Sequence, residues 1–152
     1  MKKIVLLVFI LSVLGLGFIK KSDDEFLNNF LGLKFDYVLT YDSRVCDESL
    51  IDVGVVKIGF YSNDKLNLIN KKNKQYIQSE TVVLGGVEVD EILNILDAKV
   101  VKKYKIGDVD VYQCYSKGLK KFNYEKRVKF NLQIAVNFDE VKIGYPTIVE
   151  GF

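Results

Sequence analysis

The sequence predicts an α+β domain with a duplicated helix-plus-antiparallel-meander unit. We expect two helices packed on one face of the sheet, preceded by an N-terminal apolar signal or anchor helix. Three observations predict this fold class. An uncharged run opens the chain, two similar amphipathic stretches occur further along, and strand-like segments follow each of them.

The opening segment, residues 1–21, predicts a signal peptide or a membrane anchor. Two lysines precede the uncharged run 4–19. At about 1.5 Å of rise per residue, a helix over this run is roughly 24 Å long, shorter than a hydrocarbon core of about 30 Å. Gly15 and Gly17 supply the small residues of a cleavage site before Phe18. A retained anchor and a buried helix remain alternatives.

Cleavage and anchoring both place residues 22–152 outside the cytoplasm. The protein is then either secreted or anchored on the outer face of the cytoplasmic membrane. The exported part is long enough to bury a core. The chain has one proline and no low-complexity linker. We therefore predict a single exported α+β domain.

Two amphipathic stretches support an internal repeat, because residues 24–28 match residues 90–94 in type. The predicted helices are 24–31 and 88–97. The apolar faces consist of Phe26, Leu27, Phe30 and Leu31 in the first helix, and of Ile92, Leu93 and Leu96 in the second. The halves of the duplicated domain are then 22–85 and 86–152. Convergence of two short amphipathic helices is the alternative.

Strand-like segments follow each helix. They cover 34–41, 53–61, 65–70 and 75–84 in the first half, and 99–106, 109–115, 127–137 and 141–149 in the second. The alternation in 127–137 predicts a strand with one wet face. Gly107-Asp108 suits a two-residue hairpin turn. Pro146 predicts an edge position or a bulge in the last strand, because proline cannot donate a ladder hydrogen bond.

A helix-and-meander unit that occurs twice resembles the TATA-box-binding-protein-like fold. Among exported proteins, the chain resembles the YwmB type of Gram-positive bacteria, which also begins with an apolar segment. The stretch VKFNLQIAVNFDEVKIGYPTIVEGF is similar to that type: a strand, a tight turn and a glycine-proline strand. The resemblance implies a fold but no activity or site residues. It does not imply DNA binding, because a fold does not determine function.

Catalytic and metal sites have little support in the sequence. There is no histidine, so Ser-His and Cys-His nucleophile pairs are excluded. We predict no catalytic residue, no metal site and no cofactor. The loop YDSRVCDESLID is predicted to be a solvated acidic loop, with calcium binding as the alternative. Its carboxylates belong to Asp42, Asp47, Glu48 and Asp52.

The two cysteines, Cys46 and Cys114, are a disulfide candidate. Outside the cytoplasm two cysteines can pair, and a bridge closing so long a loop stabilises a fold by about 4 kcal/mol. Two separate thiols are the alternative. In that case Cys114, which lies in a strand-like stretch, is a packed apolar residue.

Positive charge gathers in the second half of the chain, with ten Lys or Arg against three Asp or Glu in 99–129. The stretch YSKGLKKFNYEKRVKF interleaves cations with aromatic residues. Outside the cytoplasm the available polyanions are phospholipid headgroups and phosphate-rich wall polymers, so no nucleic acid is expected. A solvated hairpin loop is the alternative. The predicted polyanion-binding residues are Lys117, Lys120, Lys121, Phe122, Tyr124, Lys126, Arg127 and Lys129.

The leading functional prediction is an exported, non-enzymatic binding or interaction domain at the outer surface of the cell membrane or in the wall. Its partner is then an unknown protein, an anionic envelope polymer or the membrane surface. One alternative is a carboxylate-based hydrolase acting on cell-wall glycan. Another is a structural partner-docking protein. A pocket lined by two or more buried acids would favour the hydrolase, and projecting aromatics would favour binding.

Overall fold

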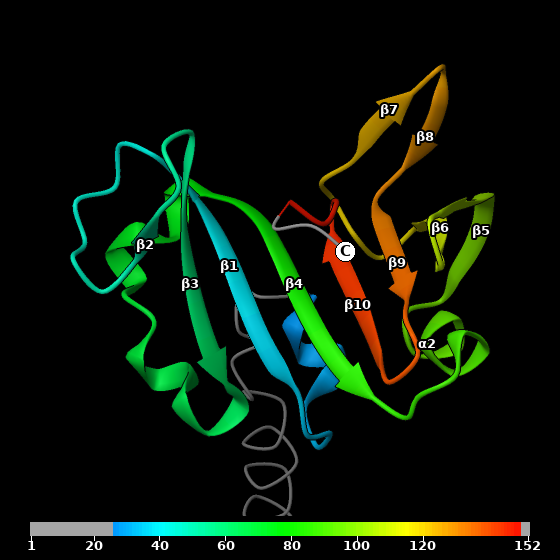
Figure 1. Cartoon of the computed structure of the whole chain (residues 1–152), viewed down its shortest axis with the longest axis horizontal. Coiled ribbons are helices and arrows are strands. Elements are labelled where there is room, and N and C mark those ends of the chain that lie inside the picture. Colours follow the sequence, from blue (N-terminus) through cyan, green and yellow to red (C-terminus); the bar gives the residue numbers. More distant parts are fainter. Residues whose placement is uncertain (1–25, 150–152) are drawn as a thin grey trace, which may run out of the picture.

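The computed structural model describes residues 26–149, which form an antiparallel sheet with few helices (Figure 1). The eight-stranded sheet has the order β2-β3-β1-β4-β10-β9-β6-β5, and β7 and β8 form a separate hairpin. The strands are β1 Asp36–Asp42, β2 Ile51–Asp52, β3 Val56–Ser62, β4 Ile77–Gly85, β5 Ala98–Ile106, β6 Val109–Ser116, β7 Asn123–Glu125, β8 Val128–Phe130, β9 Leu132–Val136 and β10 Glu140–Tyr145. The helical segments are η1 Leu27–Phe30, η2 Asn63–Leu68, η3 Lys71–Tyr76 and α2 Val89–Ile95. The α+β class is confirmed at this level.

The two halves of the chain meet in the middle of the sheet, where β4 pairs with β10 and Val82 lies opposite Ile143. In the second half, β5, β6, β9 and β10 form a meander, interrupted by the β7–β8 hairpin. In the first half, β1 lies between β3 and β4, so these three strands do not form a meander. The duplication stays a prediction, because Asp24-Glu25 of its first copy and the 1–21 segment lie outside the described residues.

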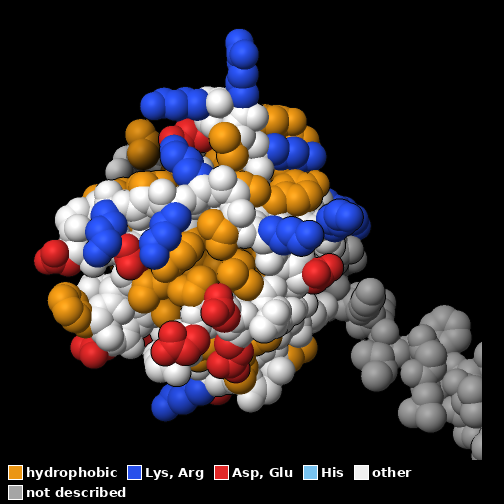
Figure 2. All heavy atoms as spheres, turned by 90° about the vertical axis from the view of Figure 1, so that its right-hand side faces the viewer, with side chains coloured by type: hydrophobic (Ala, Val, Ile, Leu, Met, Phe, Trp, Pro, Cys, Tyr) orange, Lys and Arg blue, Asp and Glu red, His pale blue; other side chains and the backbone are white. Residues whose placement is uncertain are grey.

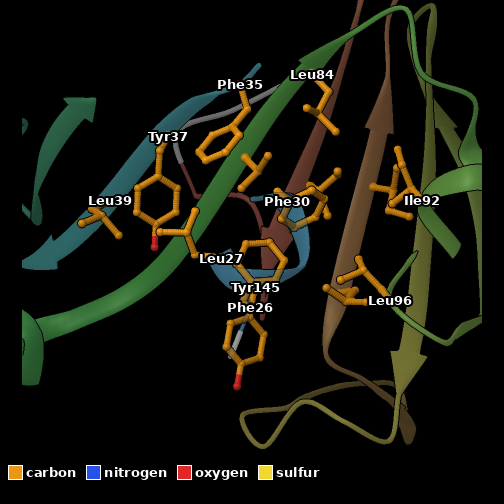
Figure 3. Packing of buried hydrophobic residues seen from close by; sticks show 14 of the residues in the cluster. Phe26, Leu27, Phe30, Phe35, Tyr37, Leu39, Leu84, Ile92, Leu96 and Tyr145 are labelled. Carbon is orange, nitrogen blue, oxygen red and sulfur yellow. The ribbon is translucent and has the colours of Figure 1, made fainter. Parts of the chain in front are cut away.

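The η1 and α2 regions pack on the same face of the sheet. Alternate residues of β1, β4, β10, β9 and β6 turn their apolar side chains to this face. Phe26 and Phe30 of the η1 region contribute to the same buried cluster as Ile92 and Leu96 of the α2 region. Figure 3 shows Phe26 and Phe30 in the middle of the cluster, between the β1 side chains and those of the α2 region. The core therefore joins both halves.

Two segments of the first half differ from the prediction. Residues 65–70, predicted to be a strand, lie largely in the 3-10 helix η2, whose side chains are at most partly buried. In the predicted helix 24–31, the described part is the single 3-10 turn η1. Gly32 follows it with φ 99°, a conformation that glycine adopts without strain and that ends the turn. Within residues 26–149 no helix is long and apolar enough to span a membrane.

The predicted continuous strand 127–137 is wrong, because Asn131 divides it into β8 and β9. The Asn131 side chain is fully buried and bonds the backbone of Ser116 and Leu119. The predicted wet face of this strand is also wrong. Gln133 is 6 % exposed, because its amide bonds Thr147 and Tyr104 under the C-terminal segment.

The last strand is not an edge strand, since β10 pairs with β4 on one side and β9 on the other. It ends at Tyr145, so Pro146 lies outside the ladder and its missing N–H costs no sheet hydrogen bond. The residues that follow cross the face opposite the helices. There Ser79 Oγ donates a hydrogen bond to the Thr147 carbonyl. Ile148 lies so close to Gly144 that a Cβ on Gly144 would clash with it.

Candidate cleft between the sheet edge and the hairpin

A cleft of about 430 Å³ lies where β5 and β6, at one edge of the sheet, meet the β7–β8 hairpin. This volume falls within the range of about 300–1,000 Å³ that is usual for small-molecule sites. Three cations, one carboxylate, one aromatic ring and one aliphatic side chain line it. They belong to Lys99, Lys117, Lys129, Asp97, Tyr115 and Val101.

Strand pairing brings Lys99 and Tyr115 together. The two-residue turn Gly107-Asp108 joins β5 to β6, as predicted, and Ile106 pairs with Val109 across it. A bulge between Val100 and Lys102 then shifts the register, so that Lys99 lies opposite Tyr115. Facing residues of paired strands turn to the same face of a sheet. This face is the one opposite Cys114 and the helix-covered core.

The Lys129 ammonium is held between two aromatic rings. Its Nζ lies 4.1 Å from the centre of the Phe122 ring and 5.1 Å from the centre of the Tyr115 ring. The Phe122 ring in turn meets Tyr124 edge to face at 5.6 Å. Each cation–π contact of this kind is worth about 0.5–1 kcal/mol at an exposed site. The contacts therefore position the Lys129 charge at the cleft before any ligand arrives.

The hairpin is tied to the sheet by Glu125. Its Oε1 accepts a hydrogen bond from Lys102 Nζ of β5 at 2.6 Å. Its Oε2 accepts one from the Gln113 amide of β6. The hydrogen bond from Lys102, followed by the one from Gln113, holds the pKa of this carboxyl below its ordinary value. Glu125 thus links the hairpin to both β5 and β6, the strands that carry other lining residues.

The three cleft lysines form no ion pair with residues 26–149, and among these residues the Lys129 ammonium has only its ring contacts. Figure 2 views the β5 side of the molecule and shows an apolar patch with Lys and Arg side chains on its flanks and above it, and Asp and Glu below. Val100 and Val101 of β5 are each 42 % exposed, and Val101 lines the cleft. The region combines unpaired positive charge with apolar surface.

The predicted polyanion-binding residues divide into three groups. Lys117, Lys129 and Phe122 meet at the cleft. Lys120 and Lys121 lie elsewhere, since their backbone N–H groups donate to the Tyr145 hydroxyl. Lys121 Nζ also lies 3.9 Å from Glu80 Oε1, and both Tyr145 and Glu80 belong to the helix-covered face. The eight predicted residues therefore do not share one face.

The third group occupies the turn of the hairpin and a neighbouring position in β7, where Tyr124 pairs with Lys129. Lys126 and Arg127 form the two-residue turn, with φ of 47° and 73°, and both side chains are exposed. Tyr124 is 64 % exposed. These residues project from the hairpin and are absent from the cleft lining.

Sequence reasoning missed Lys99, Val101, Tyr115 and Asp97 as site residues. The signal lay in the Gly107-Asp108 turn, because a two-residue turn sets which residues pair across a hairpin. Counting back from this turn places Lys99 opposite Ser116. The bulge changes the partner of Lys99 to Tyr115. The local sequence contains no pattern that predicts the bulge.

Carboxylates of the acidic loop form hydrogen bonds and ion pairs with neighbouring residues. Arg44 Nε lies 2.8 Å from Asp42 Oδ1, and its hydrogen bonds lower the pKa of Asp42 to about 2. Asp47 accepts hydrogen bonds from Ser49 and Asn73. Within the described part of the chain, no group of three or more His, Cys, Asp or Glu side chains is placed to hold a metal ion.

The candidate disulfide is not formed in this structure. Cys46 is exposed and Cys114 is buried, and both are free. Cys46 follows β1, and four strand spacings separate β1 from β6, the strand of Cys114. At about 4.8 Å per spacing this amounts to roughly 19 Å, far beyond the reach of a disulfide. Burial raises the pKa of the Cys114 thiol to about 12.

Comparison of the chain with protein-family models, curated proteins and solved structures finds no match. The site geometry is therefore the basis for a functional proposal.

Proposed function

We propose that this chain is an exported, non-enzymatic binding domain whose cleft holds an anionic, phosphate-bearing ligand of the cell envelope. The observation that carries the proposal is the lining of the cleft, where Lys99, Lys117 and Lys129 converge against the single carboxylate of Asp97. The formal charge of this lining is positive. Each ammonium offers three hydrogen-bond donors and no acceptor, which suits phosphate oxygens.

The shape of the site favours a polymer segment over a lipid bilayer. A bilayer surface reaches side chains that project, such as Lys126 and Arg127 at the hairpin tip. A cleft of about 430 Å³ instead admits a small unit or a chain end. The unpaired state of Lys99 and Lys117 supports this further, because a ligand phosphate meets them without first breaking an internal ion pair.

The compartment in this proposal rests on the uncharged run 4–19 and on the resemblance to the YwmB type. With export, the phosphate-bearing partners within reach are wall polymers and lipid headgroups. The duplicated plan of halves 22–85 and 86–152 belongs to the same proposal. It is tested by an experimental structure that includes residues 22–25.

The hydrolase alternative has less support in the cleft. A glycosidase of the usual kind works with two carboxyl groups flanking the bond, and among residues 26–149 Asp97 is the one carboxylate that lines this cleft. Glu80 is the one buried acid among residues 26–149. Its Oε2 accepts a hydrogen bond from Tyr37 at 2.5 Å on the helix-covered face.

The test compares two sources of phosphate with the full-length chain in mild detergent. Cosedimentation with purified phosphodiester wall polymer is measured beside cosedimentation with vesicles that contain anionic lipid. We expect polymer binding that weakens as salt rises, because a Debye length of about 8 Å at physiological ionic strength screens surface charge. Binding to the vesicles without binding to the polymer would contradict the proposed ligand and indicate that the domain binds the membrane surface.

A matched pair of variants separates the cleft from general charge. Substituting Gln for Lys99, Lys117 and Lys129 is expected to abolish polymer binding. The control substitutes Gln for Lys34, Lys71 and Lys72, which are exposed lysines outside the cleft. The control removes the same charge. Its affinity for the polymer should stay within about twofold of that of the unsubstituted chain, because remote exposed charges are screened. Equal loss in both variants would reject the cleft as the site.

A further inference from the structure

The lining of the cleft contains residues that binding of a polyanion by itself does not require. Asp97 adds a carboxylate beside the three lysines, and Tyr115 and Val101 add an apolar wall. Near a protein surface, two like charges about 4 Å apart repel by roughly 4 kcal/mol. A fully ionised phosphate polymer gains nothing from Asp97, because it has no hydrogen to donate to the carboxylate. These residues therefore select a ligand with further chemistry.

We propose that the cleft recognises a phosphorylated sugar or sugar alcohol, with the phosphate on the lysines and a hydroxyl donating to the Asp97 carboxylate. This inference rests on the proposed function and names its ligand class. A carboxylate accepts hydrogen bonds and cannot donate. Among envelope anions, sugar and polyol phosphates carry hydroxyl donors next to the phosphate, whereas inorganic polyphosphate is fully ionised near neutral pH along its chain.

Asp97 is held in place by the backbone. It lies in the turn between α2 and β5 with φ 45°, and its N–H donates to the Asn94 carbonyl at 3.3 Å. Asp and Asn tolerate this left-handed conformation better than other non-glycine residues. The carboxylate is exposed and free of ion pairs with the described residues. It is thus available at the rim of the cleft.

Tyr115 and Val101 supply a surface for the carbon skeleton of the ligand. The C–H groups of a sugar present an apolar face that packs against an aromatic ring. Tyr115 is only partly buried, and one cation, Lys129, lies 5.1 Å from its ring centre. A phosphate on Lys129 therefore places the attached carbon skeleton beside the Tyr115 ring. One ligand can therefore contact Lys129 through its phosphate and Tyr115 through its carbon skeleton.

The test measures affinity by calorimetry for four probes with the full-length chain. The probes are glycerol 3-phosphate, inorganic phosphate and tripolyphosphate, and glucose 1-phosphate serves as the cyclic form. We expect the two organic phosphates to bind at least tenfold more tightly than inorganic phosphate. The Asp97→Asn variant keeps a residue that tolerates the turn, so thermal stability should be unchanged.

Asp97→Asn is expected to weaken the organic phosphates at least fivefold and to leave tripolyphosphate equal or tighter. Tyr115→Leu should weaken glucose 1-phosphate and leave inorganic phosphate unchanged. Organic phosphates that bind no better than inorganic phosphate, or an Asp97→Asn effect equal for every probe, would overturn the inference while anion binding at the cleft stands. Absence of binding by all probes and by the wall polymer would overturn both the inference and the proposed function.

Discussion

Glu125 and Lys102 join the β7–β8 hairpin to the edge of the sheet, with 2.6 Å between the carboxylate Oε1 and the ammonium Nζ. One residue belongs to the hairpin and the other to β5, so the pair links these two elements. The Gln113 amide adds a second tie to the same carboxylate. Glu125 therefore bonds the hairpin to both β5 and β6.

Replacing Glu125 with Gln is expected to loosen the hairpin while the sheet stays folded. An ion pair at this exposure is worth up to about 1 kcal/mol, which corresponds to about fivefold faster hydrogen exchange in residues 123–130. Ligand affinity should fall by a similar factor. Glu140→Gln is the control, because it removes an exposed carboxylate 3.9 Å from Lys142 on another part of the sheet. Unchanged exchange in Glu125→Gln would show that Phe122 and its neighbours hold the hairpin without the tie.

Acid is expected to loosen the same hairpin. The folded-state pKa of Glu125 lies below its ordinary value, so the ionised form contributes stability above the unfolded pKa of about 4.3. This contribution is lost as pH falls through the lower folded pKa. Hydrogen exchange in 123–130, corrected for intrinsic rates, should rise relative to the core below about pH 4.3. Glu125→Gln should remove this difference. A pH dependence that persists in the variant would assign the effect to another acid.

The hairpin turn carries strain that substitution should relieve. Lys126 and Arg127 both have positive φ, which Asn-Gly adopts more readily in such a turn. The double substitution Lys126→Asn and Arg127→Gly should raise the free energy of unfolding by about 1 kcal/mol, since the left-handed region costs a residue with a side chain about that much. Urea unfolding measures this. The affinity of the cleft for its ligand should stay within about twofold. A large loss of affinity would show that Lys126 and Arg127 belong to the binding site.

Asn131 is expected to be the most sensitive polar residue of the second half. It is fully buried and exchanges hydrogen bonds with Ser116 N, Ser116 O and Leu119 O at 2.7–3.0 Å. Asn131→Ala leaves these buried groups unpaired, which should cost about 3 kcal/mol in urea unfolding. Gln75→Ala, at an exposed position, should change stability by less than about 0.5 kcal/mol. Similar effects at both positions would mean that the link between β6 and β9 does not depend on Asn131.

The two cysteines should differ in reactivity. Cys46 is exposed, whereas Cys114 is buried with a pKa of about 12. A thiol reacts through its thiolate, so a maleimide at neutral pH should label Cys46 within minutes and Cys114 only after denaturation. Cys46→Ser serves as the control, and its folded form should remain unlabelled. Rapid labelling of Cys114 in the folded chain would contradict its burial.

Local pattern was sufficient for much of the architecture. Alternation and turn residues predicted strands near β1, β3, β4, β5 and β6, and Gly107-Asp108 predicted the β5–β6 turn. Of the residues predicted to form the apolar helix faces, Phe26, Phe30, Ile92 and Leu96 share one buried cluster, whereas Leu31 is 63 % exposed. These features depend on residues a few positions apart, so the periodicity of the sequence is sufficient to predict them.

Tertiary structure decided which strand lies beside which and what covers each face. Nothing local places β1 between β3 and β4, or the C-terminal segment over Gln133, because strand order and coverage depend on contacts between residues distant in the chain. The same holds for the cleft. The charge run around Lys117 and Lys129 was visible in the sequence, but their meeting with Lys99 and Tyr115 required the bulge in β5 and the tie through Glu125. Composition determined that the site would be basic and aromatic, and long-range packing determined which of those residues face the cleft.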